Sequence, residues 1–252
     1  MSVAVIIAIV VACGIGMLLV CGGLFAAFVF PTLVLARDSA QRMQCSNNVV
    51  QIGLALHSYE SDYKQLPPAY TVDADGNRLH SWRTLILPYV GQQALYSRID
   101  LSKPWDDPAN AFLQEIDLPM FRCPSSKIAP GMTTYLVIDH PSSAFPGSTG
   151  QELENITDGL SNTILVVESN DVDAVHWSEP KDLSLSSYLS ANILKARPTN
   201  AVSTVLKRSH RSGRHVVMGD GSSQFVMNNT NQEVLKGLAT CQGGETVELD
   251  DK

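Results

Sequence analysis

Residues 3–36 read VAVIIAIVVACGIGMLLVCGGLFAAFVFPTLVLA and contain no charged side chain; the first charge in the chain is Arg37. An apolar stretch of about 18 or more residues is long enough to cross the hydrocarbon core of a bilayer, which is roughly 30 Å thick. As a helix, this stretch would extend roughly 50 Å at about 1.5 Å per residue, more than one crossing requires. The sequence therefore predicts residues 1–36 as a transmembrane anchor helix.

The apolar stretch differs from a cleaved secretory signal. Such a signal has a basic N-terminal region and an apolar stretch of about 7–15 residues, whereas here only Met1 and Ser2 precede a far longer one. We therefore expect a retained single-pass anchor in the inner (cytoplasmic) membrane. Arg37 and Arg42 on its C-terminal side favour a cytoplasmic body, but the cysteines favour the opposite orientation.

Three of the five cysteines, Cys45, Cys123 and Cys241, lie beyond the apolar stretch. They form no C-x-x-C pair, which argues against a zinc or thioredoxin-like motif. Cys45 lies in a predicted helix and Cys123 in a Phe-Arg-Cys-Pro loop. A Cys45–Cys123 disulfide is the preferred pairing and would suit an oxidising compartment. Three free thiols are the alternative, and Cys241 has no assigned role.

Residues 37–252 are expected to form one α+β body with an antiparallel sheet, because predicted helices come first and strands later. A helix over 31–62, ended by Leu66-Pro67-Pro68, would present one apolar face; that face comprises Val49, Ile52, Leu56, Tyr59 and Tyr63. Two apolar runs flanking Asp220-Gly221 predict a hairpin over 216–226. The other expected elements are strands at 133–138, 163–168 and 174–177, a helix at 82–99 that is interrupted at Pro88, helices at 106–116 and 231–239, and a surface loop with one helical turn at 182–204.

Charge argues against nucleic acid as a partner. The net charge is -7, and every charged side chain lies in residues 37–252. The densest basic cluster, residues 207–214, is one short run in an acidic body, whereas nucleic-acid binding needs an extended basic surface.

The sequence also lacks the usual signatures of a catalytic site. There is no G-x-S-x-G elbow, and the histidines have no metal-ligand spacing. We therefore expect a protein that is not an enzyme and needs no cofactor.

One candidate metal site remains, a calcium loop formed by Asp73, Asp75 and Asn77, which offer oxygens at alternating positions. An EF-hand would need Glu at its twelfth position, where this chain has Thr84, and a solvated Asp-Gly-Asn turn is the alternative. The polar run Ile156-Thr-Asp-Gly-Leu-Ser-Asn-Thr163 has two interpretations too. It forms either a ligand or assembly surface, or a loop whose side chains satisfy backbone groups.

Several motifs resemble a large domain-of-unknown-function family that is expanded in planctomycete bacteria and often has a type IV pilin-like N-terminus. The resemblance extends in order over nearly all of residues 37–244. Its motifs include Arg37-Asp-Ser-Ala-Gln-Arg42-Met-Gln-Cys45, Gln51-Ile-Gly-Leu-Ala-Leu-His57, Leu66-Pro-Pro-Ala-Tyr70, His80-Ser-Trp-Arg83, Phe121-Arg-Cys-Pro-Ser125 and Gly219-Asp-Gly-Ser222.

The resemblance implies a pilin-like body in the cell envelope, outside the cytoplasm, and it implies no reaction. The resemblance also supports the calcium hypothesis for Asp73, Asp75 and Asn77, because some pseudopilins bind calcium in a loop. The chain departs from pilins in having no basic leader and no acidic residue in Gly23-Leu-Phe-Ala-Ala-Phe28, so leader cleavage and filament assembly are not expected.

The resulting hypothesis is a membrane-anchored structural or interaction protein of the cell envelope. Its expected partners are the membrane and other envelope or pilin-like subunits. One alternative is a processed pseudopilin, assembled in a type II secretion-like or type IV pilus-like system. Others are an envelope module that binds a glycan or a peptide, and an envelope hydrolase.

Overall fold

Helix α1 spans Val3–Tyr63, which is 61 residues, and continues through Pro31 without interruption. The computed structural model describes residues 2–193 and 213–244. The chain divides into two compact units, Met1–Met43 and Gln44–Lys252, and α1 contributes to both. In the first unit the large apolar side chains that are described, from Val3 to Phe25, are exposed to solvent.

The prediction of a transmembrane helix is wrong for the described residues. No helix within residues 2–193 and 213–244 combines the length and the apolarity that crossing a membrane requires. The apolar stretch does not end as a separate element, since α1 carries on past Arg37 through charged and polar residues to Tyr63. The α+β class with small antiparallel sheets is confirmed.

In the second unit, α1 buries the face that its periodicity predicts. Val49, Ile52, Leu56 and Tyr59 are buried, whereas Tyr63 is 57% exposed. The helix ends before Lys64, whose φ of 61° is left-handed. The Lys64 N–H still donates to the carbonyl of Glu60 at 2.7 Å, so one helical carbonyl is satisfied just beyond the last turn.

The main sheet has four antiparallel strands in the order β10-β9-β6-β4. These strands are β4 (Tyr135–Leu136), β6 (Ile164–Glu168), β9 (Gly213–Met218) and β10 (Ser223–Met227). The predicted hairpin is confirmed as β9 and β10, with Gly221 at a φ of 82° in the connecting turn.

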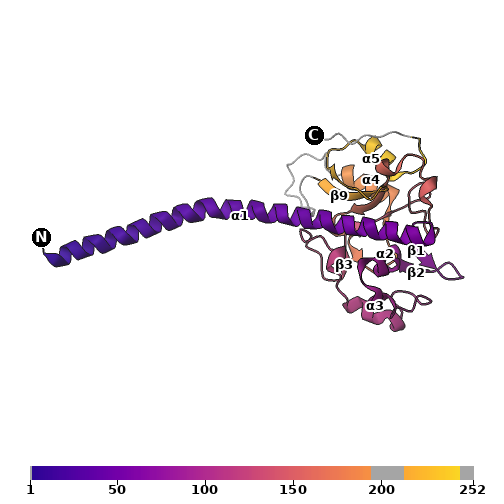
Figure 1. Cartoon of the computed structure of the whole chain (residues 1–252), viewed down its shortest axis with the longest axis horizontal. Helices are drawn as coiled ribbons and strands as arrows, with labels where there is room; N and C mark the ends of the chain where they lie inside the picture. Colours follow the sequence, from indigo (N-terminus) through magenta and orange to yellow (C-terminus); the bar gives the residue numbers. More distant parts are fainter. Residues whose placement is uncertain (1, 194–212, 245–252) are drawn as a thin grey trace. The chain divides into compact units, whose positions relative to one another are not determined.

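Alternation along the central strands gives the sheet two buried faces. Val217 of β9 joins the core that contains the buried face of α1. Its neighbours Val216 and Met218 face a second core, which includes Tyr188 and Leu235. Those residues belong to α4 (Leu185–Ile193) and α5 (Gln232–Ala239), two helices that pack together and are visible beside β9 in Figure 1. The sheet therefore lies between α1 on one face and α4 with α5 on the other.

The expected strand at 133–138 is divided into three short strands with three different partners. β3 (Met132–Thr133) pairs with β7 (Val175–His176), β4 pairs with β6, and β5 (Ile138–Asp139) pairs in parallel with β8 (Leu183–Ser184). The break at Val137 has a cause, because its N–H donates to a side-chain oxygen of Asp182 at 3.0 Å instead of to a strand.

The remaining elements are short. The expected helix at 82–99 forms as three pieces, and that at 106–116 as a 3₁₀ helix; part of the expected loop at 182–204 is β8 and α4, and its end lies outside the described residues. The bounds are β1 Tyr70–Val72, β2 Arg78–Ser81, α2 Trp82–Leu85, η1 Leu87–Val90, α3 Gln93–Tyr96, η2 Pro108–Glu115, η3 Pro119–Phe121, η4 Leu153–Asn155, η5 Leu160–Asn162 and η6 Asp171–Asp173.

Candidate functional site

A densely bonded polar site in the described part of the body surrounds Arg83, in the first turn of α2. Ser81 caps this short helix, since its hydroxyl accepts from the Arg83 backbone N–H at 3.2 Å. The cap turns Trp82 and Arg83 inward, and both side chains are fully buried. A buried guanidinium requires an acceptor for each of its five N–H groups.

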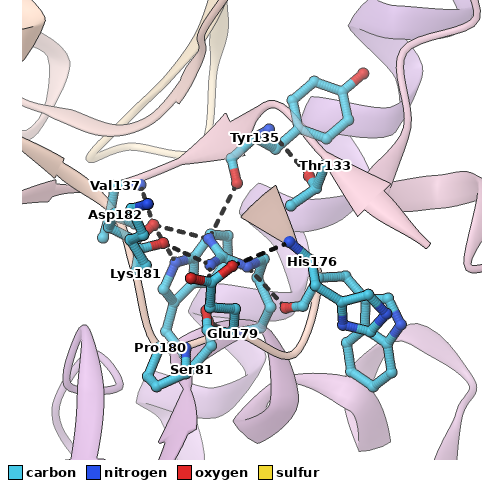
Figure 2. Close-up of polar contacts among 12 residues, drawn as sticks. Ser81, Thr133, Tyr135, Val137, His176, Glu179, Pro180, Lys181 and Asp182 are labelled. Atoms are coloured by element: carbon cyan, nitrogen blue, oxygen red, sulfur yellow. Dashed lines mark hydrogen bonds and ion pairs between the residues drawn. The ribbon is translucent and has the colours of Figure 1, made fainter. Parts of the chain in front are cut away.

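Arg83 has those acceptors, and most come from one segment of chain (Figure 2). Nη1 donates to Oδ1 of Asp182 at 2.7 Å and to the carbonyl of Tyr135 at 3.2 Å. The other acceptors are the carbonyls of Trp177, bound by Nε at 2.9 Å, and of Glu179 and Lys181, each bound by Nη2 at 3.0 Å. All five N–H groups are therefore used inside the protein.

Asp182 supplies the counter-charge. Its Oδ1 accepts from Arg83, from the Trp82 indole at 3.1 Å and from the Val137 backbone at 3.0 Å. Complete burial raises the pKa of the Asp182 carboxyl, and the neighbouring guanidinium opposes that rise. The Arg83–Asp182 pair joins α2, β4 and the 177–182 segment. The side chains of both residues are buried.

His176 borders this network. Its Nδ1 lies 2.8 Å from the Ser178 hydroxyl, and its ring stacks on Trp105 with centroids 5.7 Å apart. Burial lowers the pKa of the His176 imidazole, and the positive charge of Arg83 lowers it further. The ring is thus held in its neutral form at neutral pH. The bonds around Arg83 hold α2, β4 and the 177–182 segment together, and the Arg83 and Asp182 side chains are buried.

The predicted calcium residues lie in the turn between β1 and β2. Oδ1 of Asp73 accepts from the backbone N–H groups of Asp75 and Asn77, at 2.9 and 2.8 Å. Oδ2 accepts from the Asn77 side-chain amide at 2.9 Å. These bonds, the side-chain one foremost, lower the pKa of the Asp73 carboxyl. Both carboxylate oxygens thus accept from the turn itself, and calcium binding there stays a prediction.

The polar run at 156–163 satisfies backbone groups near the C-terminus. The Asp158 carboxylate accepts from the backbone N–H groups of Gly243 and Gly244, at 2.8 and 2.7 Å. The Asn162 amide donates to the Asp158 carbonyl at 3.1 Å. Nearby, Cys241 is a free, buried cysteine, and burial raises the pKa of its thiol.

The predicted Cys45–Cys123 disulfide is confirmed. Sequence reasoning missed its buried neighbour Glu168, as it missed the roles of Arg83 and Asp182. The only sequence signal for Arg83 was its place in the His80-Ser-Trp-Arg83 motif. The basic cluster at 207–214 lies mostly outside the described residues.

Comparisons with known proteins agree with the resemblance in part. A family described as "Protein of unknown function (DUF1559)" matches residues 35–151. That stretch includes the α1 face, Cys45, Cys123 and Arg83, but neither Glu168 nor Asp182. No curated protein and no solved structure matches the chain.

Proposed function

We propose that the protein is a structural or interaction protein of the cell envelope, and that the N-terminal part of α1 is its assembly element. The observation that carries this proposal is the exposure of large apolar side chains on the uncharged N-terminal part of α1. Val3, Met17 and Phe25 are 73%, 71% and 69% exposed. Apolar surface of this extent is stabilised by burial against a partner.

The partner that we propose is the same uncharged helical segment in a second copy of the chain. The N-terminal part of α1 has no charged side chain and so offers neither ion pairs nor a polar rim, and packing against a similar helical segment is the association it favours. The buried polar network of the body is consistent with a structural role, because Arg83 and Asp182 are fully engaged in holding segments together.

The envelope location is proposed from the disulfide, because disulfides persist in oxidising compartments and are rare in the cytosol. Alkylating thiols in intact cells, followed by mass spectrometry of the Cys45 and Cys123 peptides, tests this location. We expect both cysteines in one unalkylated, cross-linked peptide. Alkylation of both would contradict the proposed compartment.

Photo-cross-linking tests the assembly role. A photoreactive amino acid at Ile15, which is 55% exposed in the first unit, should give adducts between two differently tagged copies of the chain. The same group at Val172, which is 67% exposed in the body, is the matched control and should give none. Adducts from Val172 alone would place assembly on the body and overturn the proposal.

A second candidate function, glycan binding, is favoured by an aromatic cluster at the end of α1. Tyr63 stacks on Tyr59 with centroids 4.3 Å apart, and Tyr89 packs edge-on to Tyr59. An exposed aromatic face suits the apolar face of a sugar ring. Tyr63→Ala should abolish retention on a peptidoglycan column, while Met227→Ala, at an exposed site on β10, should not. Equal retention of both variants would remove this candidate.

A further inference from the structure

Among the described residues, one group of three or more His, Cys, Asp or Glu side chains lies close enough to hold a metal ion together, namely Cys45, Cys123 and Glu168. The two sulfurs and a carboxylate oxygen lie within 4.8 Å of one another. All three residues are buried, at 0%, 0% and 1% exposure. In the oxidised protein the sulfurs bond to each other, so the group has metal-binding chemistry only when the disulfide is reduced.

Contacts other than the disulfide hold the two cysteines close together. Asn48 lies one turn after Cys45 on α1, and its amide donates to the carbonyl of Arg122 at 3.1 Å and to that of Pro119 at 3.4 Å. The Gln44 amide in turn donates to Asn48 Oδ1 at 3.0 Å. Asn48 therefore fastens the segment next to Cys123 to the helix that carries Cys45, and reduction leaves these bonds in place.

Glu168 is fixed independently of the cysteines. It ends β6, a central strand that pairs with β4 and β9. Its Oε2 accepts from the His215 backbone N–H at 3.3 Å. The neighbouring strands β4 and β9 thus fix the backbone of Glu168. We therefore expect its carboxylate to remain beside the two sulfurs after the disulfide is reduced.

The donor set suits a thiophilic divalent cation. Zn²⁺ binds thiolate at about 2.3 Å and carboxylate oxygen at about 2.0–2.2 Å. Two sulfurs on one tetrahedral zinc are therefore roughly 3.8 Å apart, so the two sulfurs, which are bonded in the disulfide, must separate after reduction while the carboxylate oxygen remains within reach. Three anionic ligands buried together would repel one another without a cation, and soft thiolates select zinc over calcium or magnesium.

We propose that the reduced chain binds one Zn²⁺ through the thiolates of Cys45 and Cys123 and the carboxylate of Glu168, so that the metal replaces the disulfide as the cross-link. A dithiol reductant supplies two electrons and two protons to the disulfide and becomes a disulfide itself. The two resulting thiols release their protons when they bind the metal. In the reverse step a disulfide oxidant takes two electrons from the two thiolates and becomes a pair of thiols, so that the Cys45–Cys123 disulfide forms again and the ion is released.

Cobalt(II) is a direct probe, because thiolate ligation gives it a sulfur-to-metal charge-transfer band and tetrahedral geometry gives it visible bands. The full chain, with Cys13, Cys21 and Cys241 replaced by Ala, is reduced and titrated with Co²⁺ and then Zn²⁺. We expect one Co²⁺ per chain, displaced by Zn²⁺, and no bands in the oxidised chain. Absent bands in the reduced chain, or equal bands in the oxidised one, would overturn the proposal.

Glu168→Gln separates this site from binding by the cysteines alone. It should weaken Co²⁺ binding by at least about tenfold, since loss of even an outer-shell partner has that effect. Unchanged affinity would contradict the role of Glu168. X-ray absorption of the Zn²⁺-loaded, reduced chain needs no Glu168 variant. It should show two sulfur ligands and at least one oxygen, and a zinc shell without sulfur would exclude the site.

Discussion

At Arg83, the burial of a full positive charge is tolerated because each N–H group of the guanidinium has an acceptor within 3.2 Å. Most of these acceptors are backbone carbonyls, so the side chain holds a segment of chain in place while only Asp182 balances its charge. Removing one member of such a pair leaves the other charge buried and unpaired, which is more damaging than never having had the pair.

Asp182→Asn tests that balance. The amide keeps the shape and one acceptor oxygen but leaves Arg83 as an unpaired buried cation, so we expect the free energy of unfolding at pH 7 to fall by about 3–5 kcal/mol. Equilibrium urea denaturation measures the change. Asp139→Asn is the control, because its partner Arg78 is 43% exposed and such pairs contribute about 0–1 kcal/mol. A small loss in Asp182→Asn would mean that Asp182 is protonated in the folded protein.

His176 predicts a pH dependence. Its pKa is lowered below 6.5 in the folded protein, by burial first and by Arg83 second. At a pH between the lowered pKa of folded His176 and the pKa of 6.5 in the unfolded chain, the unfolded chain binds more protons than the folded protein. The contribution of His176 to the free energy of unfolding is therefore complete above pH 6.5 and is lost as the pH falls below it. Urea midpoints measured across this range should show the decline, and His176→Gln should make it shallower. His80, with a pKa also lowered by burial, contributes in the same direction. An unchanged slope in His176→Gln would show that His176 does not carry the effect.

Among the elements, the β9–β10 hairpin depends on glycine for two separate reasons. Gly221 has a φ of 82°, and a Cβ there would lie 3.1 Å from Cδ2 of His57 on α1. Gly76 has a similar φ of 86° but nothing within 4 Å. We expect Gly76→Ala to lower the free energy of unfolding by about 1 kcal/mol through backbone strain alone, and Gly221→Ala to lower it by more. Thermal unfolding of both variants measures the difference.

His57→Ala supplies the complementary test of that contact. In the Gly221→Ala background it should recover the part of the loss that exceeds Gly76→Ala, because it removes the ring that the new methyl group meets. No recovery would mean that backbone strain accounts for the whole effect at Gly221.

Local signals explain which elements the sequence could predict. Asp220-Gly221 between alternating apolar residues contains the information for the hairpin, and the spacing of Val49, Ile52 and Leu56 contains it for the buried face of α1. The strand expected at 133–138 failed because Asp182, 45 residues from Val137, takes the N–H that a continuous strand would have used. No periodicity within 133–138 records that partner.

At the scale of the whole molecule, the same reasoning applies to the candidate sites. Cys45 and Cys123 could be paired from residue chemistry, since few cysteines were available. Arg83 and Asp182 are 99 residues apart, and a single sequence gives no reason to join them. The length of the uncharged stretch led to the prediction of a separate transmembrane helix. In the structure this stretch is part of α1, which continues through charged residues to Tyr63. The length and composition of one segment therefore did not predict the bounds of the helix that contains it.

The disulfide is a covalent constraint on the body, and it joins residues 78 apart in the chain. Closing a loop of that length should stabilise the folded state by about 4 kcal/mol, mainly by restricting the unfolded chain. The double variant Cys45→Ala, Cys123→Ala should lose about that much in urea denaturation, with a metal chelator present so that no ion replaces the cross-link. Cys241→Ala, which removes a buried sulfur without opening a loop, is the control and should lose about 1 kcal/mol. Equal losses in the two variants would show that packing of the sulfurs, and not loop closure, gives the disulfide its effect on stability.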